Sequence, residues 1–136
     1  MTPYTFSRLN DHLVMISWQR SPRSDEAKQY ITDLTRLLDD SPEPLFFISD
    51  MRKGRIMEMS IIKQLSELAR HPHWAGSTAF TETSLSRMFG EDYRRMVVAD
   101  KVDRNQIFRE PEQALAYLET LCPGLTAGVD WEALLG

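Results

Sequence analysis

The densest group of chemically active side chains follows directly after an apolar run. Asp50 ends that run, and three cations come shortly after it: Arg52, Lys53 and Arg55. Such a cluster beside a helix start could hold a phosphate or a carboxylate, because guanidinium groups pair with both and a helix N-terminus favours anions. The alternative is a solvated loop in which Asp50 organises the turn, and no glycine-rich phosphate cradle accompanies the cluster.

Three methionines lie among these charges. Met51, Met57 and Met59 belong to the same segment, residues 51–60. Unbranched thioether side chains suit a surface that adapts to a partner, and they also fill gaps in cores. Together with the cations they predict an apolar patch with a basic rim, which is our candidate partner or ligand surface.

Other reactive residues point away from catalysis. His71 and His73 flank Pro72, but no cysteine or further histidine stands at metal-ligand spacing, so we predict no metal and no cofactor. Cys122 is the only cysteine, which indicates a structural thiol rather than a disulfide or a redox pair. The chain has no nucleophile elbow and no phosphate-binding loop. We therefore predict that the protein is not an enzyme.

Composition narrows the class of protein further. Its 136 residues are 42% hydrophobic and 26% charged, which fits one folded domain. A net charge of -4 argues against nucleic-acid binding, which needs a basic face. No apolar run approaches the roughly 20 residues that cross a bilayer. The N-terminus also lacks the pattern of a secretory signal, so the cytoplasm is the expected location.

The apolar run before the charge cluster predicts a buried central strand. Residues 45–48 are consecutive apolar side chains, Pro42 and Pro44 precede them, and Gly54 closes the segment. An unbroken run fits a strand covered on both faces, and in open α/β sheets ligands gather where such strands end. We therefore expect residues 45–50 in the middle of the sheet and residues 51–60 at its rim.

Apolar spacing and helix breakers predict the remaining elements. Strands are expected over 4–7, 13–18, 74–81 and 106–108, and helices over 25–38, 57–70, 83–97 and 111–121, with a charged connection over 100–104. Ser24 is the predicted N-cap of the first helix, and Pro111 opens the last. The order predicts an α/β fold: a four- to five-stranded, mostly parallel sheet with an N-terminal antiparallel hairpin and about four packed helices.

The tail, residues 125–136, is predicted to follow a domain spanning residues 1–124. It contains a short amphipathic stretch with Trp131, Leu134 and Leu135. An exposed Trp-Leu-Leu face is unfavourable in water, so we expect it to pack on its own domain or on another subunit. Homodimerisation through these three residues is a separate prediction.

Taken in order, these features resemble the SpoIIAA-like, or STAS-like, domain family of small bacterial proteins. The resemblance covers roughly residues 4–121 and rests on the opening hairpin, the strand-ending acid in Phe47-Ile48-Ser49-Asp50, the helix end Leu68-Ala69-Arg70-His71-Pro72, and the stretch from Ile107 to Leu118. It implies a sheet covered by helices, no catalytic chemistry, and a role in protein interaction or small-ligand binding.

The resemblance also marks one serine. In anti-sigma factor antagonists, a serine at the start of the helix after the central strand is phosphorylated, within an Asp-Ser-Ser-Gly-Leu pattern. Here Glu58 and Ser60 match that pattern, whereas Met59 and Ile61 replace its small residues. Ser60 is thus a candidate phosphoacceptor, with a helix-start or capping residue as the alternative that we favour.

Two functions remain after these exclusions. The leading hypothesis is a non-catalytic bacterial interaction module that docks a protein partner through residues 51–60, with a regulatory role as a further expectation. The alternative is a binder of a small amphipathic or anionic ligand such as a lipid or fatty acid, which requires an apolar cavity between helix and sheet.

Overall fold

The computed structural model describes residues 2–81 and 105–135, and a five-stranded sheet forms its centre. Along the sheet the strands follow the chain order, with β1 antiparallel to β2 and every later pair parallel. This confirms the predicted fold class and the opening hairpin. The strands are β1 (Tyr4–Arg8), β2 (Leu13–Trp18), β3 (Leu45–Asp50), β4 (Trp74–Phe80) and β5 (Asn105–Phe108).

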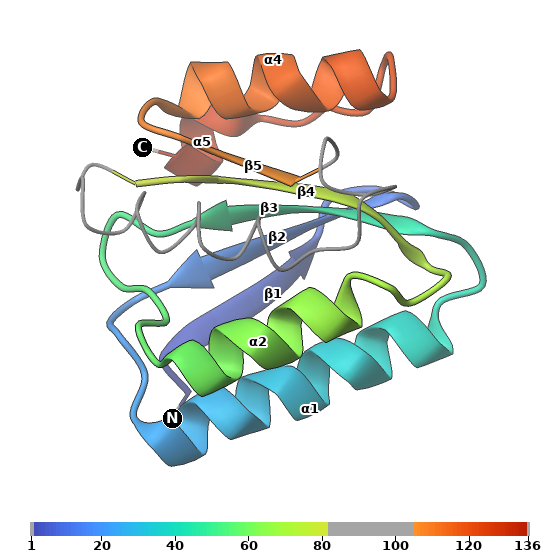
Figure 1. The fold of residues 1–136 in the computed structure, drawn as a ribbon. Helices are drawn as coiled ribbons and strands as arrows, with labels where there is room; N and C mark the ends of the chain where they lie inside the picture. The colour runs from blue at the N-terminus through green and yellow to red at the C-terminus, as the bar shows by residue number, and fades with distance from the viewer. Residues whose placement is uncertain (1, 82–104, 136) are drawn as a thin grey trace.

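Helices cover both faces of the sheet (Figure 1). On one face lie α1 (Ser24–Asp40) and α2 (Met59–Leu68), and on the other lie α4 (Pro111–Leu121) and the short α5 (Trp131–Leu135). The predicted helix over residues 83–97 and the predicted connection over 100–104 fall outside the described residues. Among the helices that the structure describes, none is long and apolar enough to cross a membrane.

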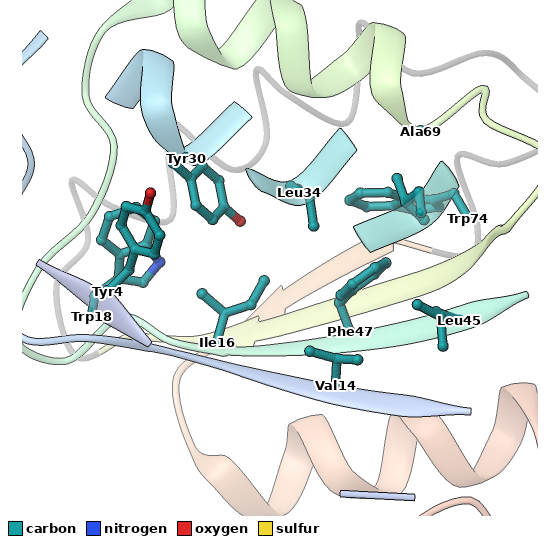
Figure 2. Packing of buried hydrophobic residues seen from close by; sticks show 11 residues of the cluster. Tyr4, Val14, Ile16, Trp18, Tyr30, Leu34, Leu45, Phe47, Ala69 and Trp74 are labelled. Carbon is teal, nitrogen blue, oxygen red and sulfur yellow. The ribbon is translucent and has the colours of Figure 1, made fainter. Parts of the chain in front are cut away.

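Strand β3 occupies the middle of the sheet. Its side chains contribute to two hydrophobic clusters, one on each face of the sheet. Phe47 packs with the helix α1 and α2 cluster, whereas Phe46 and Ile48 pack on the α4 side. Figure 2 shows Phe47 among Val14, Ile16, Leu45 and Trp74 in the first cluster. Burying a large apolar side chain contributes roughly 1.5–3 kcal/mol, which explains why this unbroken run occupies the centre.

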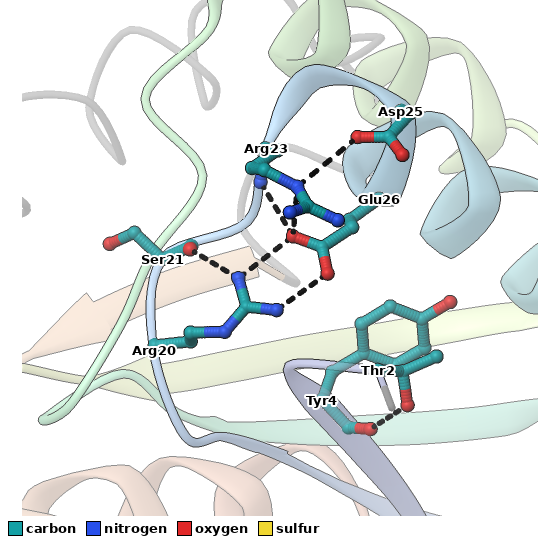
Figure 3. Close-up of polar contacts among 7 residues, drawn as sticks. All are labelled: Thr2, Tyr4, Arg20, Ser21, Arg23, Asp25 and Glu26. Carbon is teal, nitrogen blue, oxygen red and sulfur yellow. Dashed lines mark hydrogen bonds and ion pairs between the residues drawn. The ribbon is translucent and has the colours of Figure 1, made fainter.

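Helix α1 begins one residue differently from the prediction. Ser24 is its first helical residue, and Arg23 is the N-cap. The reason is Glu26, whose carboxylate accepts the Arg23 backbone N–H at 2.9 Å and two bonds from the Arg20 guanidinium (Figure 3). A carboxylate at the third helical position thus satisfies the helix start without a serine cap.

The tail packs on its own domain. Trp131 and Leu135 lie against the α4 cluster, and the Trp131 indole N–H donates to the Thr126 carbonyl at 3.0 Å. Glu119 holds the preceding turn by accepting the backbone N–H groups of Gly124 and Thr126, each at 2.8 Å. The Thr126 hydroxyl also donates to the Glu119 carboxylate. This third bond has the largest effect, and together the three bonds lower the pKa of Glu119.

Candidate functional site

The carboxyl ends of β2, β3, β4 and β5 meet at one rim of the sheet because these strands run parallel. The β3–α2 connection, residues 51–58, leaves β3 at that rim. It is tied there by the Met51 backbone N–H, which donates to the Phe80 carbonyl at 3.0 Å. The segment that the sequence singled out therefore lies at the sheet edge where α/β proteins place their sites.

Asp50 and Arg52 form a closed unit at the start of this connection. The Asp50 carboxylate accepts Arg52 Nε at 3.0 Å and Nη2 at 2.8 Å, and it also accepts the Arg52 backbone N–H at 3.1 Å. Arg52 Nη2 donates further to the Leu135 carbonyl at 3.1 Å, and the guanidinium lies 5.3 Å from the centre of the Phe80 ring. Asp50 thus organises the turn and also orients the Arg52 guanidinium.

The next part of the connection is fastened to the β2–α1 linker. Gly54 is buried, and a Cβ added there would overlap the carbonyl group of Arg20 and lie 2.6 Å from the Ser21 backbone nitrogen. The adjacent Arg55 backbone N–H donates to the Ser21 hydroxyl at 3.2 Å. Only glycine permits this approach of two backbones, so Gly54 fixes where the Arg55 side chain starts.

Arg55 differs from Arg52 because its charge has no partner among the described residues. Its side chain is half-buried, and its Nε is shielded from solvent without a hydrogen-bond acceptor. Within residues 2–81 and 105–135, the structure records no ion pair or hydrogen bond for its guanidinium. An unpaired, half-buried guanidinium is unfavourable unless an anion or water completes it.

The end of the connection is exposed and apolar. Met57 is 40% exposed and Met59 44% exposed, and Lys53 extends into solvent on the same connection. Ser60 is exposed in the first turn of α2, and its hydroxyl lies 3.3 Å from a Glu58 carboxylate oxygen. Met51, in contrast, is half-buried against the α1 and α2 core cluster.

A pocket of about 110 Å³ lies between α2 and the sheet, behind this connection. Strand alternation places Phe47 and Ser49 of β3, Ala79 of β4 and Ile107 of β5 on its side of the sheet. Its lining residues are mostly apolar, and Trp18, Tyr30, Phe47 and Trp74 contribute aromatic surface. The described lining comprises Ile16, Trp18, Tyr30, Phe47, Ser49, Met51, Arg55, Ile56, Ile62, Leu65, Trp74, Ser77, Thr78, Ala79, Asn105, Gln106 and Ile107.

Two polar side chains of the pocket lining, those of Asn105 and Ser77, are hydrogen-bonded to each other. The Asn105 side-chain oxygen accepts the Trp74 indole N–H at 2.9 Å and the Ser77 hydroxyl at 2.6 Å. Asn105 is itself buried, so this network fixes the β4–β5 edge of the floor.

Tyr30 stands at the other end of the pocket. Burial raises the pKa of its hydroxyl, so the phenol stays neutral, and no hydrogen bond to another described residue is recorded for it. Its ring packs against Tyr4, Phe6 and Trp18.

The histidine pair is structural. His71 Nε2 lies 2.8 Å from Asp39, and its Nδ1 accepts the His73 backbone N–H at 3.0 Å. His73 Nδ1 lies 3.0 Å from the Leu38 carbonyl. Both rings thus connect the end of α1 to the α2–β4 turn. Among the described residues, no group of three metal-ligating side chains is close enough to hold an ion.

Sequence reasoning located the rim segment but not the pocket. It named Asp50, Arg52, Lys53 and Arg55 as one cluster, whereas the structure separates them into a closed pair, a solvated lysine and an unpaired arginine. The described pocket residues come from four strands, two helices and the β3–α2 connection, so no local pattern could assemble them. An available signal was the short strand in which Asn105 and Ile107, two positions apart, share one face.

Comparison with known proteins supports the fold. No protein-family model matches the chain, and no curated protein matches its sequence. The solved structure of the anti-sigma factor antagonist SpoIIAA in its unphosphorylated form is similar at a TM-score of 0.61 and 10% identity, covering 86% of this chain and 96% of that one.

A second similar structure is an uncharacterised protein of the DUF3478 family from Shewanella loihica PV-4, described as having a SpoIIAA-like fold. Its TM-score is 0.57 at 11% identity, over 85% of this chain and 91% of that one. The strand order, the antiparallel first strand and both structural similarities lead to one conclusion: this chain has the SpoIIAA-like fold.

Proposed function

We propose that the protein is a non-catalytic bacterial interaction module of the cytoplasm, which docks a protein partner through the rim of its sheet. The observation that carries this proposal is the pair of exposed methionines, Met57 and Met59, where the rim connection enters α2. Lys53 is an exposed cation on the same connection. We call Lys53, Met57 and Met59 the methionine patch.

Exposure of this kind is uncommon in the described part of the chain. The large hydrophobic residues with exposed side chains there are only Met57, Met59 and Leu134. Met57 and Met59 lie two positions apart in the sequence. Methionine gains apolar contact area on binding and adapts its shape to a partner. Replacing solvent at such a patch by a partner's apolar surface supplies the driving force for association, and the lysine supplies orientation.

The fold supports a protein as the partner. The similar SpoIIAA is described as an anti-sigma factor antagonist, and its structure as the unphosphorylated form. In this chain Ser60 is exposed one position after the patch, at the start of α2. A phosphate on Ser60 would add negative charge beside Glu58 and the patch, so we propose Ser60 as a site through which phosphorylation would weaken docking.

Partner capture with matched variants tests the docking proposal. Purified protein is coupled to beads and mixed with bacterial lysate, and the proteins retained are quantified by mass spectrometry. Wild type is compared with Met57→Asp and with Leu134→Asp, which places the same charge at an equally exposed hydrophobic residue on α5. Circular dichroism confirms that each variant is folded.

The expected result is a specific protein that wild type and Leu134→Asp retain and that Met57→Asp loses. A partner retained equally by all three would contradict docking through the methionine patch. A phosphomimetic Ser60→Glu should reduce capture of the same protein, whereas Ser60→Ala should not.

Binding of a small amphipathic ligand is the second candidate function. The pocket between α2 and the sheet favours it, because ligand sites are mostly apolar hollows with few polar groups, and this one has Arg55 at its lining. The two functions use different surfaces, since neither Met57 nor Met59 is among the pocket residues.

Homodimerisation through the tail stays a prediction. Trp131 and Leu135 already pack on their own domain, which leaves Leu134, at 40% exposed, as the tail residue best placed to contact a second copy. If the tail forms a dimer, Leu134→Glu should convert it to a monomer in light scattering, because a charge in an apolar contact is unfavourable. An unchanged mass would exclude this residue from a dimer contact.

A further inference from the structure

We propose that the pocket between α2 and the sheet binds an amphipathic monocarboxylic acid, with Arg55 holding the carboxylate and the apolar body lying over β3, β4 and β5. The inference rests on the second candidate function and names its site and ligand chemistry. It does not depend on the methionine patch.

The charge of Arg55 has no partner among the described residues. Arginine is always protonated in proteins, so its guanidinium keeps its positive charge even where it is half-buried. Arg55 Nε is shielded from solvent without an acceptor, and no carboxylate among the described residues pairs with the group. Bringing an anion to this position would satisfy donors that the protein leaves open, which is how a site gains affinity and specificity.

The backbone that carries Arg55 is held in place by the neighbouring β2–α1 linker. Gly54 brings the connection against the Arg20 backbone, and the Arg55 N–H is bonded to the Ser21 hydroxyl. Arg20 is itself held by two bonds to Glu26, at 2.8 and 2.6 Å. The Arg55 side chain therefore starts from a braced backbone, and less conformational freedom is lost when it binds a ligand.

The described lining of the pocket is mostly apolar. Ala79 and Ile107 form its floor on β4 and β5, and Ile62 and Leu65 of α2 lie among its lining. Thr78, whose hydroxyl is also buried without a partner, pairs with Ile48 and so faces α4 instead. The described pocket thus offers an apolar surface with one unsatisfied cation, which matches a ligand with one charged end.

Charge decides between classes of anion. Arg55 is the only charged residue among the described lining residues, so the described part of the site offers a single positive charge. A planar carboxylate carries one negative charge and pairs with one guanidinium through two parallel bonds, whereas phosphate groups carry more charge and recruit several donors. The absence of an acidic residue from the described lining disfavours a cationic ligand.

Calorimetric titration with decanoate tests this assignment, with 1-decanol as the neutral probe of similar shape. The wild-type protein should bind decanoate more tightly than 1-decanol. Arg55→Gln should weaken decanoate binding by about 10- to 100-fold, the range expected for lost hydrogen bonds to a charged group. The same variant should leave 1-decanol binding unchanged.

Lys53→Gln is the matched control, because it removes a cation from the same connection but outside the pocket. It should leave decanoate binding unchanged. Ala79→Leu should block both probes by filling the floor. Because this variant could also disturb folding, methyl NMR shifts of Ile62, Ala79 and Ile107 in the wild-type protein provide a second test, and decanoate should move all three.

The outcomes separate the two levels of the inference. If neither probe binds wild type, the ligand function and the carboxylate site both fail. If both probes bind equally and Arg55→Gln changes neither, the pocket binds ligands but the Arg55 assignment is wrong. Decanoate binding that leaves the three methyl signals unmoved would place the ligand elsewhere and overturn the site.

Discussion

Arg52 and Arg55 lie on the same β3–α2 connection but differ in how their guanidinium groups are bound. Arg52 makes two bonds to the Asp50 carboxylate, one to the Leu135 carbonyl, and a face contact with Phe80. Arg55 is half-buried, with a shielded Nε and no recorded partner for its guanidinium. In the first half of the β3–α2 connection the arginine is bound by other groups of the protein, whereas in the second half the arginine has no partner among the described residues.

This contrast separates structural charge from functional charge. A guanidinium with its donors satisfied holds parts of the fold together, in this case β3 to the tail. A guanidinium that is held in place with unsatisfied N–H donors is unfavourable until a ligand accepts hydrogen bonds from it. Sites of this kind lower the stability of a protein in exchange for binding. We therefore expect substitutions in the two halves to separate into losses of stability and losses of binding.

The largest effect is expected at Gly54, which joins the two halves. Gly54→Ala would push a methyl group into the Arg20 carbonyl. Because the contacted atoms of Arg20 and Ser21 are backbone atoms, they cannot easily move away. We expect a loss of about 2–4 kcal/mol in the free energy of unfolding, measured by urea denaturation.

Gly124→Ala is the matched comparison for this variant. At Gly124 nothing lies within 4 Å of an added Cβ, but φ is +89°. That left-handed strain alone should cost about 1 kcal/mol. Equal losses at the two glycines would show that Gly54 is not held by close packing.

The next effect is expected for Arg52→Gln. This change removes the bidentate bond to Asp50 and the bond to the Leu135 carbonyl. We expect a loss of about 1–2 kcal/mol in the free energy of unfolding, reduced by the partial exposure of the pair. Decanoate affinity should not change. Lys53→Gln serves as the control and should alter stability by less than about 0.5 kcal/mol.

A smaller, pH-dependent effect is expected at Glu26, which braces the linker behind Arg55. The Arg20 guanidinium, together with the Arg23 N–H, lowers the pKa of Glu26 from its ordinary 4.5 to about 2. The folded state therefore favours the charged carboxylate, and its contribution is complete above pH 4.5 and lost as the pH falls towards 2.

Glu26→Gln should consequently be less stable than wild type near neutral pH. The difference in stability should shrink as the pH is lowered from 4.5 towards 2. Thermal unfolding followed over this range measures it. A difference that stays constant down to pH 2 would show that the ion pair does not cause the effect.

The smallest change in stability is expected for Arg55→Gln. Because the Arg55 guanidinium has no recorded partner, its removal breaks no bond and should alter the free energy of unfolding by less than about 0.5 kcal/mol, in either direction. Urea denaturation in the absence of ligand measures this. A loss as large as that of Arg52→Gln would abolish the contrast between the two arginines.

Much of the fold could be predicted because its signals are local. The unbroken run Leu45–Ile48 predicted a central strand, and Pro111 marked the start of α4 correctly. The start of α1 was misplaced by one residue because Glu26 satisfies that helix end from within the helix. A cap can come from more than one position, and spacing alone does not choose among them.

The sequence by itself determined the class of fold, the middle strand and the charged segment that follows it, because apolar spacing and breaker residues act between neighbours along the chain. Only the tertiary structure decided which arginine is paired, why Gly54 must be glycine, and that a pocket lies under α2. Those features depend on contacts between segments far apart in sequence, such as Arg52 with Leu135 and Arg55 with Ser21. Identical residue types in one short segment acquire different roles through such contacts.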